Sequence, residues 1–233
     1  MTEVKVVNGF NIYPFESKQE FVEYLREEDP RKILIALNAE KLIKTEGDLK
    51  TIINENIGFP DGVGAVLALK KKGVKAQKIA GAEFWLNIIE EFYKEKSFYL
   101  IGAELEVIEG TIEKLRRKFK GIRIVGYHDG FFEEEGFERI LSDIERAKPD
   151  VVFVAMGSPK QEFLMNRMKA RHSALYMGLG GSFDVYTGKL QRAPQFWIDN
   201  NMEWAYRLIK QPKRIVRQVF LVKFLYLLAR GKL

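Results

Sequence analysis

The sequence predicts an α/β fold, a Rossmann-like parallel sheet covered by helices, followed by a basic amphipathic C-terminal helical tail. Apolar runs without polar alternation recur along the chain, and amphipathic stretches of helical period separate them. Strands that are buried on both faces of a parallel sheet have this unalternated pattern. The chain has 233 residues, of which 46% are hydrophobic, so it can bury one large α/β core.

The predicted elements follow one another in a regular order. A strand at residues 33–37 precedes a helix over residues 39–56 and a turn-rich loop at residues 58–64. Further strands are expected at residues 98–101, 122–125, 151–155 and 174–177, and further helices at residues 82–94, 104–118, 133–147 and 159–171. Glycine is expected near the ends of several strands, at Gly102, Gly126, Gly157 and Gly178. Open α/β sheets bind ligands at the carboxyl ends of their strands, which favours a nucleotide or sugar site there. The alternative is that glycine only terminates the strands.

The amino-acid composition excludes some types of functional site and makes others improbable. The chain has no cysteine, which excludes a disulfide framework, a cysteine metal site and a thiol nucleophile. His128 and His172 are the only histidines, so a zinc site and a Ser-His-Asp relay are poorly supplied. The N-terminus lacks a secretory signal, and no apolar run reaches about 18 residues. We therefore expect a cytoplasmic protein without a spanning helix.

The positive charge is concentrated at the C-terminus. Residues 204–233 contain eight lysines and arginines and no Asp or Glu, although the whole chain has a net charge of only +6. We therefore divide the chain into an α/β domain (residues 1–203) and a basic appendage (residues 204–233). If residues 213–229 form a helix, it is too short to span a bilayer but suits the interface of an anionic membrane leaflet. A C-terminal core helix, a nucleic-acid surface and a homo-oligomer interface are the alternatives. We expect no nucleic-acid partner, because the aromatic residues lie within aliphatic runs and do not form a stacking platform.

Two polar residues follow early apolar segments. Asn38 stands directly after the first strand, where a helix N-cap belongs, and its amide could also face the cleft. Asp61 lies in a Pro-Asp-Gly turn just ahead of an apolar helix. A carboxylate held there could accept a proton from a sugar hydroxyl, or it could cap the helix.

Three glycine-containing loops are candidate ligand sites. In Gly157-Ser-Pro-Lys160-Gln161 a buried strand meets a helix N-terminus, which favours a phosphate, although the P-loop spacing is absent. The segment from Gly178 to Asp184, with Gly180 and Gly181, lacks the dinucleotide fingerprint, but Asp184 could hold a nucleoside hydroxyl or base edge or cap a helix. The loop that contains Gly130 and Phe131 is a further strand end.

These segments together resemble the WecG/TagA/CpsF glycosyltransferase family. The resemblance extends from Asn38 to the tail and rests on LNAEK, PDG, AGAEFW, GYHDGFF, VAMGSPKQE, LYMGLGGSFDVYTGKLQRAP and EWAYRLIKQPKRIVRQ. Within the family, the chain is most similar to members that transfer N-acetyl-D-mannosaminuronic acid in enterobacterial common antigen synthesis. It is less similar to the wall teichoic acid N-acetylmannosaminyltransferases.

The resemblance implies a reaction and its participants. A hexosyltransferase of this kind moves N-acetylmannosaminuronic acid, with inversion, from a UDP-sugar to N-acetylglucosamine linked to undecaprenyl pyrophosphate. The enzyme would be peripheral on the inner face of the cytoplasmic membrane and independent of metals. An uncharged N-acetylmannosamine donor is the alternative within the family. Outside enzymes, the alternative is a nucleotide- or nucleic-acid-binding α/β module.

The resemblance also implies roles for individual residues. Asp61 matches the proposed general base, and Asn38 and Gln161 match active-site amides. Positions that hold the uridine diphosphate, and tail arginines that close over the site, are matched by Gly130, Phe131, Asp184, Arg207, Arg214 and Arg217. Two positions depart from relatives: Ala36 stands where some have threonine, and Lys78 where some have arginine. Lysine cannot make the bidentate phosphate contact of arginine, so Lys78 is given no role. Ala36 is given no role either, because it departs from the threonine of those relatives.

Overall fold

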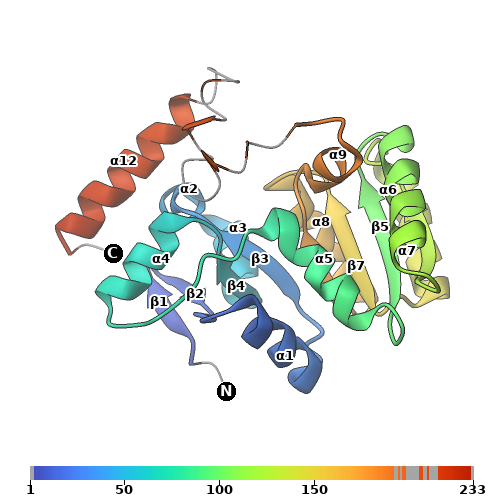
Figure 1. The fold of residues 1–233 in the computed structure, drawn as a ribbon, viewed down its shortest axis with the longest axis horizontal. Coiled ribbons are helices and arrows are strands. Elements are labelled where there is room, and N and C mark those ends of the chain that lie inside the picture. The colour runs from blue at the N-terminus through green and yellow to red at the C-terminus, as the bar shows by residue number, and fades with distance from the viewer. Residues whose placement is uncertain are drawn as a thin grey trace.

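The computed structural model describes residues 3–191, 194, 196–197, 205–206, 209 and 215–231, with the side chains of residues 215–218 excepted. Its centre is a six-stranded parallel sheet of order β4-β3-β8-β7-β5-β6 (Figure 1). The strands are β3 (Ile33–Leu37), β4 (Ile57–Pro60), β5 (Ser97–Gly102), β6 (Arg123–His128), β7 (Val151–Ala155) and β8 (Leu175–Gly178). The predicted α/β class, with a parallel sheet between helices, is confirmed.

Alternate residues of each central strand enter two separate cores. In β3, Ile33, Ile35 and Leu37 belong to one core, whereas Leu34 belongs to the other. Since successive side chains of a strand point to opposite faces, a strand covered on both sides must be apolar throughout. The unalternated runs in the sequence arise from this double coverage.

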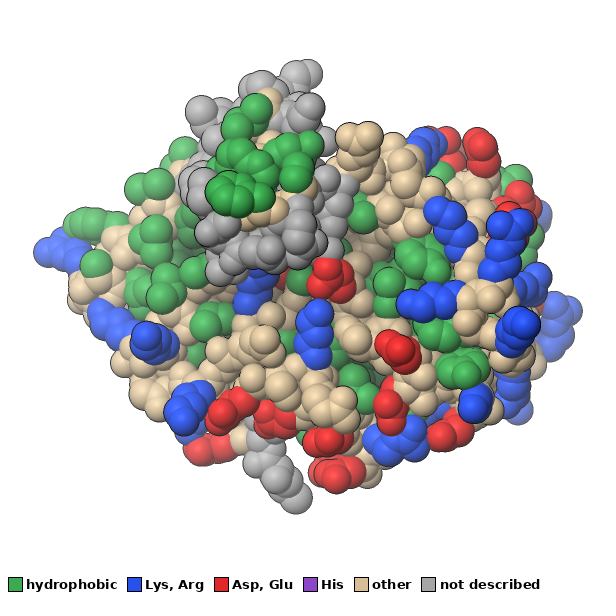
Figure 2. Space-filling view, viewed as in Figure 1, with side chains coloured by type: hydrophobic (Ala, Val, Ile, Leu, Met, Phe, Trp, Pro, Cys, Tyr) green, Lys and Arg blue, Asp and Glu red, His purple; other side chains and the backbone are tan. Residues whose placement is uncertain are grey.

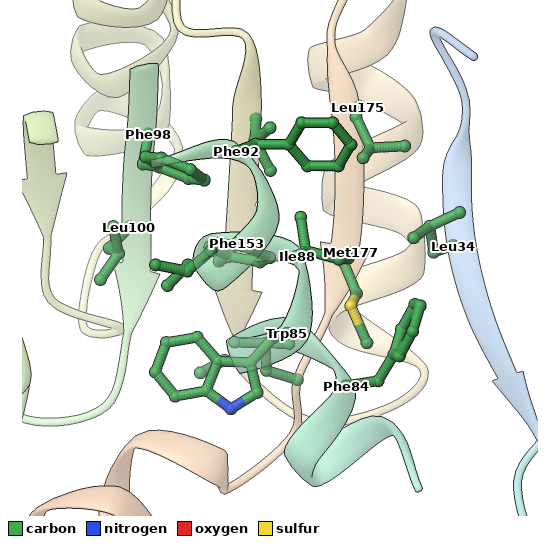
Figure 3. Packing of buried hydrophobic residues seen from close by; sticks show 14 of the residues in the cluster. Leu34, Phe84, Trp85, Ile88, Phe92, Phe98, Leu100, Phe153, Leu175 and Met177 are labelled. Carbon is green, nitrogen blue, oxygen red and sulfur yellow. The ribbon is translucent and has the colours of Figure 1, made fainter. Parts of the chain in front are cut away.

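The first core lies under α1 (Lys18–Glu28), α5 (Gly81–Phe92), α6 (Leu105–Lys118) and α9 (Ser182–Thr187). Figure 3 shows Trp85, Ile88 and Phe92 of α5 packed against side chains of the sheet. Trp85 makes edge contacts with Phe153 of β7 and Phe183 of α9, at centroid distances of 5.7 and 5.6 Å. Aromatic pairs favour this edge-to-face arrangement. Trp85 therefore fixes α9, and with it the loop that follows β8, on the sheet.

The second core lies under the helices of the opposite face and a small hairpin. The helices are α2 (Ala39–Lys44), α3 (Gly47–Asn54), α4 (Val63–Lys71), α7 (Glu134–Ala147) and α8 (Lys160–Arg171). The hairpin consists of β1 (Lys5–Val7) and β2 (Phe10–Ile12), paired antiparallel. The hairpin was not predicted from the sequence, because each of its strands has only three residues. The helix α1 was not predicted either.

Three predicted boundaries were wrong. The single helix over residues 39–56 is two helices: α2 ends before Thr45, which is extended, and α3 begins at Gly47, which has φ +58°. Residues 57–60 form β4 rather than loop, since proline is tolerated at the end of an edge strand. Gly126 lies inside β6 and does not end it; a Cβ there would lie 2.3 Å from the Tyr99 ring.

The C-terminal helix α12 (Ile215–Ala229) packs against α2 and α4 (Figure 1). Phe224 is fully buried against Gly64, where a Cβ would lie 3.3 Å from the ring. The Nζ of Lys71 donates to the carbonyl oxygens of Leu228 and Ala229, so α4 caps the end of α12. In the described part of the chain, no helix is long and apolar enough to cross a membrane.

Candidate active site

A cleft of about 920 Å³ opens at the carboxyl edge of the sheet. Its walls are the segments that follow four neighbouring strands, β4, β3, β8 and β7, together with the start of α5. Six predicted site residues line it: Asn38, Asp61, Gly157, Gln161, Gly180 and Gly181. Parallel strands all end at the same edge, so loops distant in sequence meet there.

Asn38 is both a helix cap and a wall of the cleft. Its Oδ1 accepts a hydrogen bond from the backbone N–H of Lys41 at 2.9 Å, which makes it the N-cap of α2. Its Nδ2 has no acceptor among the described residues. The capping bond therefore fixes the side chain while an N–H₂ donor remains for a ligand.

Asp61 extends the edge of the sheet by one residue beyond β4. Its backbone N–H donates to the carbonyl of Leu37 at 2.9 Å, which places it beside the residue that precedes Asn38. The N-cap of α4 is Gly62, at φ +120°, and not Asp61. The carboxylate is half-buried and lines the cleft. This is a position from which it could accept a proton from a bound hydroxyl.

Gln161 joins the loop that follows β8 to the first turn of α8. Its buried side chain accepts a hydrogen bond from the Gly180 N–H at 2.9 Å through Oε1. Its Nε2 lies against Gly178, where a Cβ would come within 2.3 Å of it. Only glycine fits at that position beside this amide. As in Asn38, the amide oxygen of Gln161 accepts a hydrogen bond, and its N–H₂ group has no acceptor among the described residues.

Bare backbone forms the wall near Gln161. Gly157 and Gly180 have φ +74° and +59°, and no atom lies within 4 Å of a Cβ built at either. Such positions let a ligand approach the main chain closely. The N–H groups of Gln161 and Glu162, however, already donate to Gly157 and Pro159. The first turn of α8 therefore has fewer free donors for a phosphate than its sequence suggests.

Four other predicted residues do not line the cleft. The Nζ of Lys160 lies 5.6 Å from the Phe132 ring centroid. Gly130 donates to the Ala103 carbonyl at the end of β5, and Phe131 beside it is 73% exposed. Asp184 lies in the first turn of α9, next to the lining residues Ser182 and Val185.

The three tail arginines are described only in part. Arg207 and Arg214 lie outside the described residues, and Arg217 lies in α12, where only its backbone is described. Ala36 lines the cleft. Lys78 does not; it precedes Ile79, whose N–H donates to the Pro60 carbonyl.

The sequence reading missed an ion pair at the base of the cleft. The Nζ of Lys41 in α2 lies 2.7 Å from Oε1 of Glu162 in α8, and the two side chains are 12% and 1% exposed. The Oε2 of Glu162 is buried without a partner in the described structure. Both residues occupy the first turns of charged helices, where a solvated position is the ordinary expectation. Nothing in the sequence distinguishes them from surface charges.

No three His, Cys, Asp or Glu side chains lie close enough to hold a metal ion in the described ranges of the chain. In a comparison with protein-family models, the model described as Glycosyl transferase WecG/TagA/CpsF family matches residues 7–233.

Breaking the buried pair from one side should destabilise the fold. Replacing Lys41→Met leaves the Glu162 carboxylate buried and unpaired, which should lower the free energy of unfolding by about 3–5 kcal/mol. The double variant Lys41→Met/Glu162→Leu should recover most of that loss, because an apolar pair needs no charge compensation. Urea unfolding followed by circular dichroism measures both. A control is Lys50→Met, which lies outside the cleft; equal stability of Lys41→Met and the parent would contradict the expectation.

Proposed function

The chain belongs to the WecG/TagA/CpsF family of glycosyl transferases, and on that premise we propose its donor, its acceptor and its mechanism. The enzyme transfers N-acetylmannosaminuronic acid, with inversion, from a UDP-sugar to N-acetylglucosamine carried on undecaprenyl pyrophosphate. The observation that carries the proposal is the cleft in which Asp61, Asn38 and Gln161 share one space in a chain matched over residues 7–233.

Asp61 is the proposed general base. Its carboxylate accepts the proton of the acceptor hydroxyl while that oxygen attacks the anomeric carbon of the donor sugar. The bond between the anomeric carbon and the phosphate oxygen breaks on the opposite side, and uridine diphosphate leaves with the electron pair. A single displacement of this kind inverts the anomeric centre. The half-buried position of Asp61 at the cleft wall supports this role.

Donors of hydrogen bonds stabilise the substrates and the leaving group in this proposal. The N–H₂ groups of Asn38 and Gln161 are held from their oxygen sides, so they are preorganised to donate. Gly157, Gly180 and Gly181 let the diphosphate approach the main chain. Arg207, Arg214 and Arg217 of the tail would supply the charge that a metal ion supplies elsewhere, so we propose a reaction without metal or cofactor.

The tail supports a membrane location. Among the described side chains of α12, four are exposed hydrophobics, namely Val219, Val222, Leu225 and Tyr226, and Figure 2 shows hydrophobic side chains gathered over this helix. Apolar side chains beside basic ones suit a helix that lies in the headgroup region of an anionic bilayer. We propose that residues 204–233 dock the α/β domain on the inner face of the cytoplasmic membrane, where the lipid acceptor resides.

Turnover with defined substrates tests the donor. With a lipid-pyrophosphate-N-acetylglucosamine acceptor, UDP-N-acetylmannosaminuronic acid should be used at least ten times more efficiently than UDP-N-acetylmannosamine. The expected ratio rests on the loss of roughly one charge-assisted hydrogen bond when the carboxylate is missing. Measured kcat/KM values for the two donors decide it. A preference for the uncharged donor would keep the family assignment and replace the donor.

Removal of the Asp61 carboxylate should abolish transfer without unfolding the protein. Both Asp61→Asn and Asp61→Ala should lower kcat by roughly 10²–10⁴-fold, the usual contribution of a general base. Radiolabelled sugar transfer to the lipid acceptor measures kcat, and thermal unfolding confirms the fold. Asp48→Asn, in α3 and outside the cleft, is the matched control. Near-normal turnover by either Asp61 variant would remove the base assignment.

Charges on the outer side of α12 should release the protein from membranes. Val219 and Val222 are 63% and 67% exposed, so Val219→Asp/Val222→Asp changes a free surface. Their apolar burial in a bilayer would be lost, and binding to anionic vesicles should fall at least about tenfold. Leu105→Asp, at an exposed position at the start of α6, is the control. A chain that ends at Lys210 should lose both vesicle sedimentation and transfer; full turnover by that chain would contradict the tail proposal.

A further inference from the structure

The ammonium of Lys41 is a cleft-facing cation held from one side. Its side chain lines the cleft and is 12% exposed, and one of its three N–H donors goes to Glu162 Oε1 at 2.7 Å. No other acceptor for it lies among the described residues. An ammonium has three donors, so two have no acceptor in the part of the chain that the structure describes. The cleft is the open side from which a ligand can satisfy them.

Glu162 fixes the position of this cation. Its carboxylate is 1% exposed and cannot contact a ligand in the cleft directly. It is anchored in α8 next to Gln161, whose side chain bridges to Gly180. The cation and the amide therefore sit on one support. A lysine has a flexible stem that costs entropy to order, and the buried carboxylate removes that cost before a ligand arrives.

The described carboxylates that line the cleft are Glu40, Glu46 and Asp61, and all three belong to segments that follow β3 or β4. Asp61 follows β4 and Glu162 follows β7, three strand spacings away, or about 14 Å. The open glycine positions Gly157 and Gly180 lie at the Glu162 end, after β7 and β8. Lys44 is the other lysine among the described lining residues. Its ammonium lies 5.5 Å from the Phe220 ring centroid and is therefore directed toward α12.

From this arrangement we propose that Lys41 is a further substrate-binding residue, which contacts the diphosphate of the nucleotide-sugar donor, and that Glu162 is its positioning residue. The inference rests on the proposed function and assigns an end of the cleft to each reacting group. The acceptor hydroxyl lies at the Asp61 end, and the leaving diphosphate lies at the Lys41 end beside the glycine backbone. An anion there gains a charge-assisted hydrogen bond that forms without reorganisation of the protein.

The test is binding of UDP and of uridine to the full chain by isothermal titration calorimetry. In Lys41→Met, the Kd for UDP should rise roughly ten- to hundredfold, the range for a hydrogen bond to a charged group. The Kd for uridine, which has no phosphate, should change less than twofold. Lys50→Met is the matched control and should bind both like the parent, because it lies outside the cleft.

The double variant Lys41→Met/Glu162→Leu separates a contact from a merely structural role, and it also serves if Lys41→Met alone fails to fold. A direct contact predicts that the double variant regains thermal stability but keeps the weakened Kd for UDP. Parent-like UDP affinity in the double variant, or an equal loss for uridine and UDP, would overturn the inference while leaving the proposed function standing. Absence of UDP binding by the parent chain would instead overturn the proposed donor.

Discussion

Parallel strand pairing is the constraint on which the rest of this molecule depends. Consecutive parallel strands need a crossover, so each strand is followed by a helix that must return across a face of the sheet. Both faces are thereby covered, and all six strands end at one edge. Asn38, Asp61, Gln161 and Gly180 are separated by up to 142 positions in the chain, yet each lies within a few residues of a strand end. The common edge of the parallel strands is therefore sufficient to bring them together in one cleft.

The same constraint explains what could be predicted from sequence. Five of the six sheet strands were recognisable. For β3, β5, β7 and β8 the reason is double burial, which makes a run such as Val151–Ala155 apolar throughout, whereas the edge strand β6 has no buried residue. The sixth, β4, contains Gly58 and ends in Pro60, and both residues resemble a turn. Gly58 is required there by packing, since a Cβ would lie 2.5 Å from Leu37 Cδ1. Local turn chemistry and tertiary packing select the same residue, and sequence alone cannot separate the two causes.

Residues that line the cleft were predictable where a backbone feature marks them. Asn38 at a cap position, Asp61 in a turn and the glycines after β7 and β8 all carry a local signal. The Lys41–Glu162 pair carries none, because burial of a charge depends on which helices become neighbours. Gly130 and Phe131 lie after β6 at the sheet edge, separated from the β7 end by β5, which the order of elements along the chain could not reveal.

The packing of the Phe224 ring against Gly64 connects the position of α12 to the first turn of α4. A Cβ at position 64 would lie 3.3 Å from the ring, a tight contact, and Gly64 belongs to the first turn of α4. That turn begins two residues after Asp61. A displacement of α12 by the thickness of a ring would have to be absorbed by this turn, because close-packed interiors transmit strain instead of dissipating it. The C-terminal helix is therefore coupled through α2 and α4 to the cleft wall, and its contact at Gly64 lies in the turn that follows Asp61.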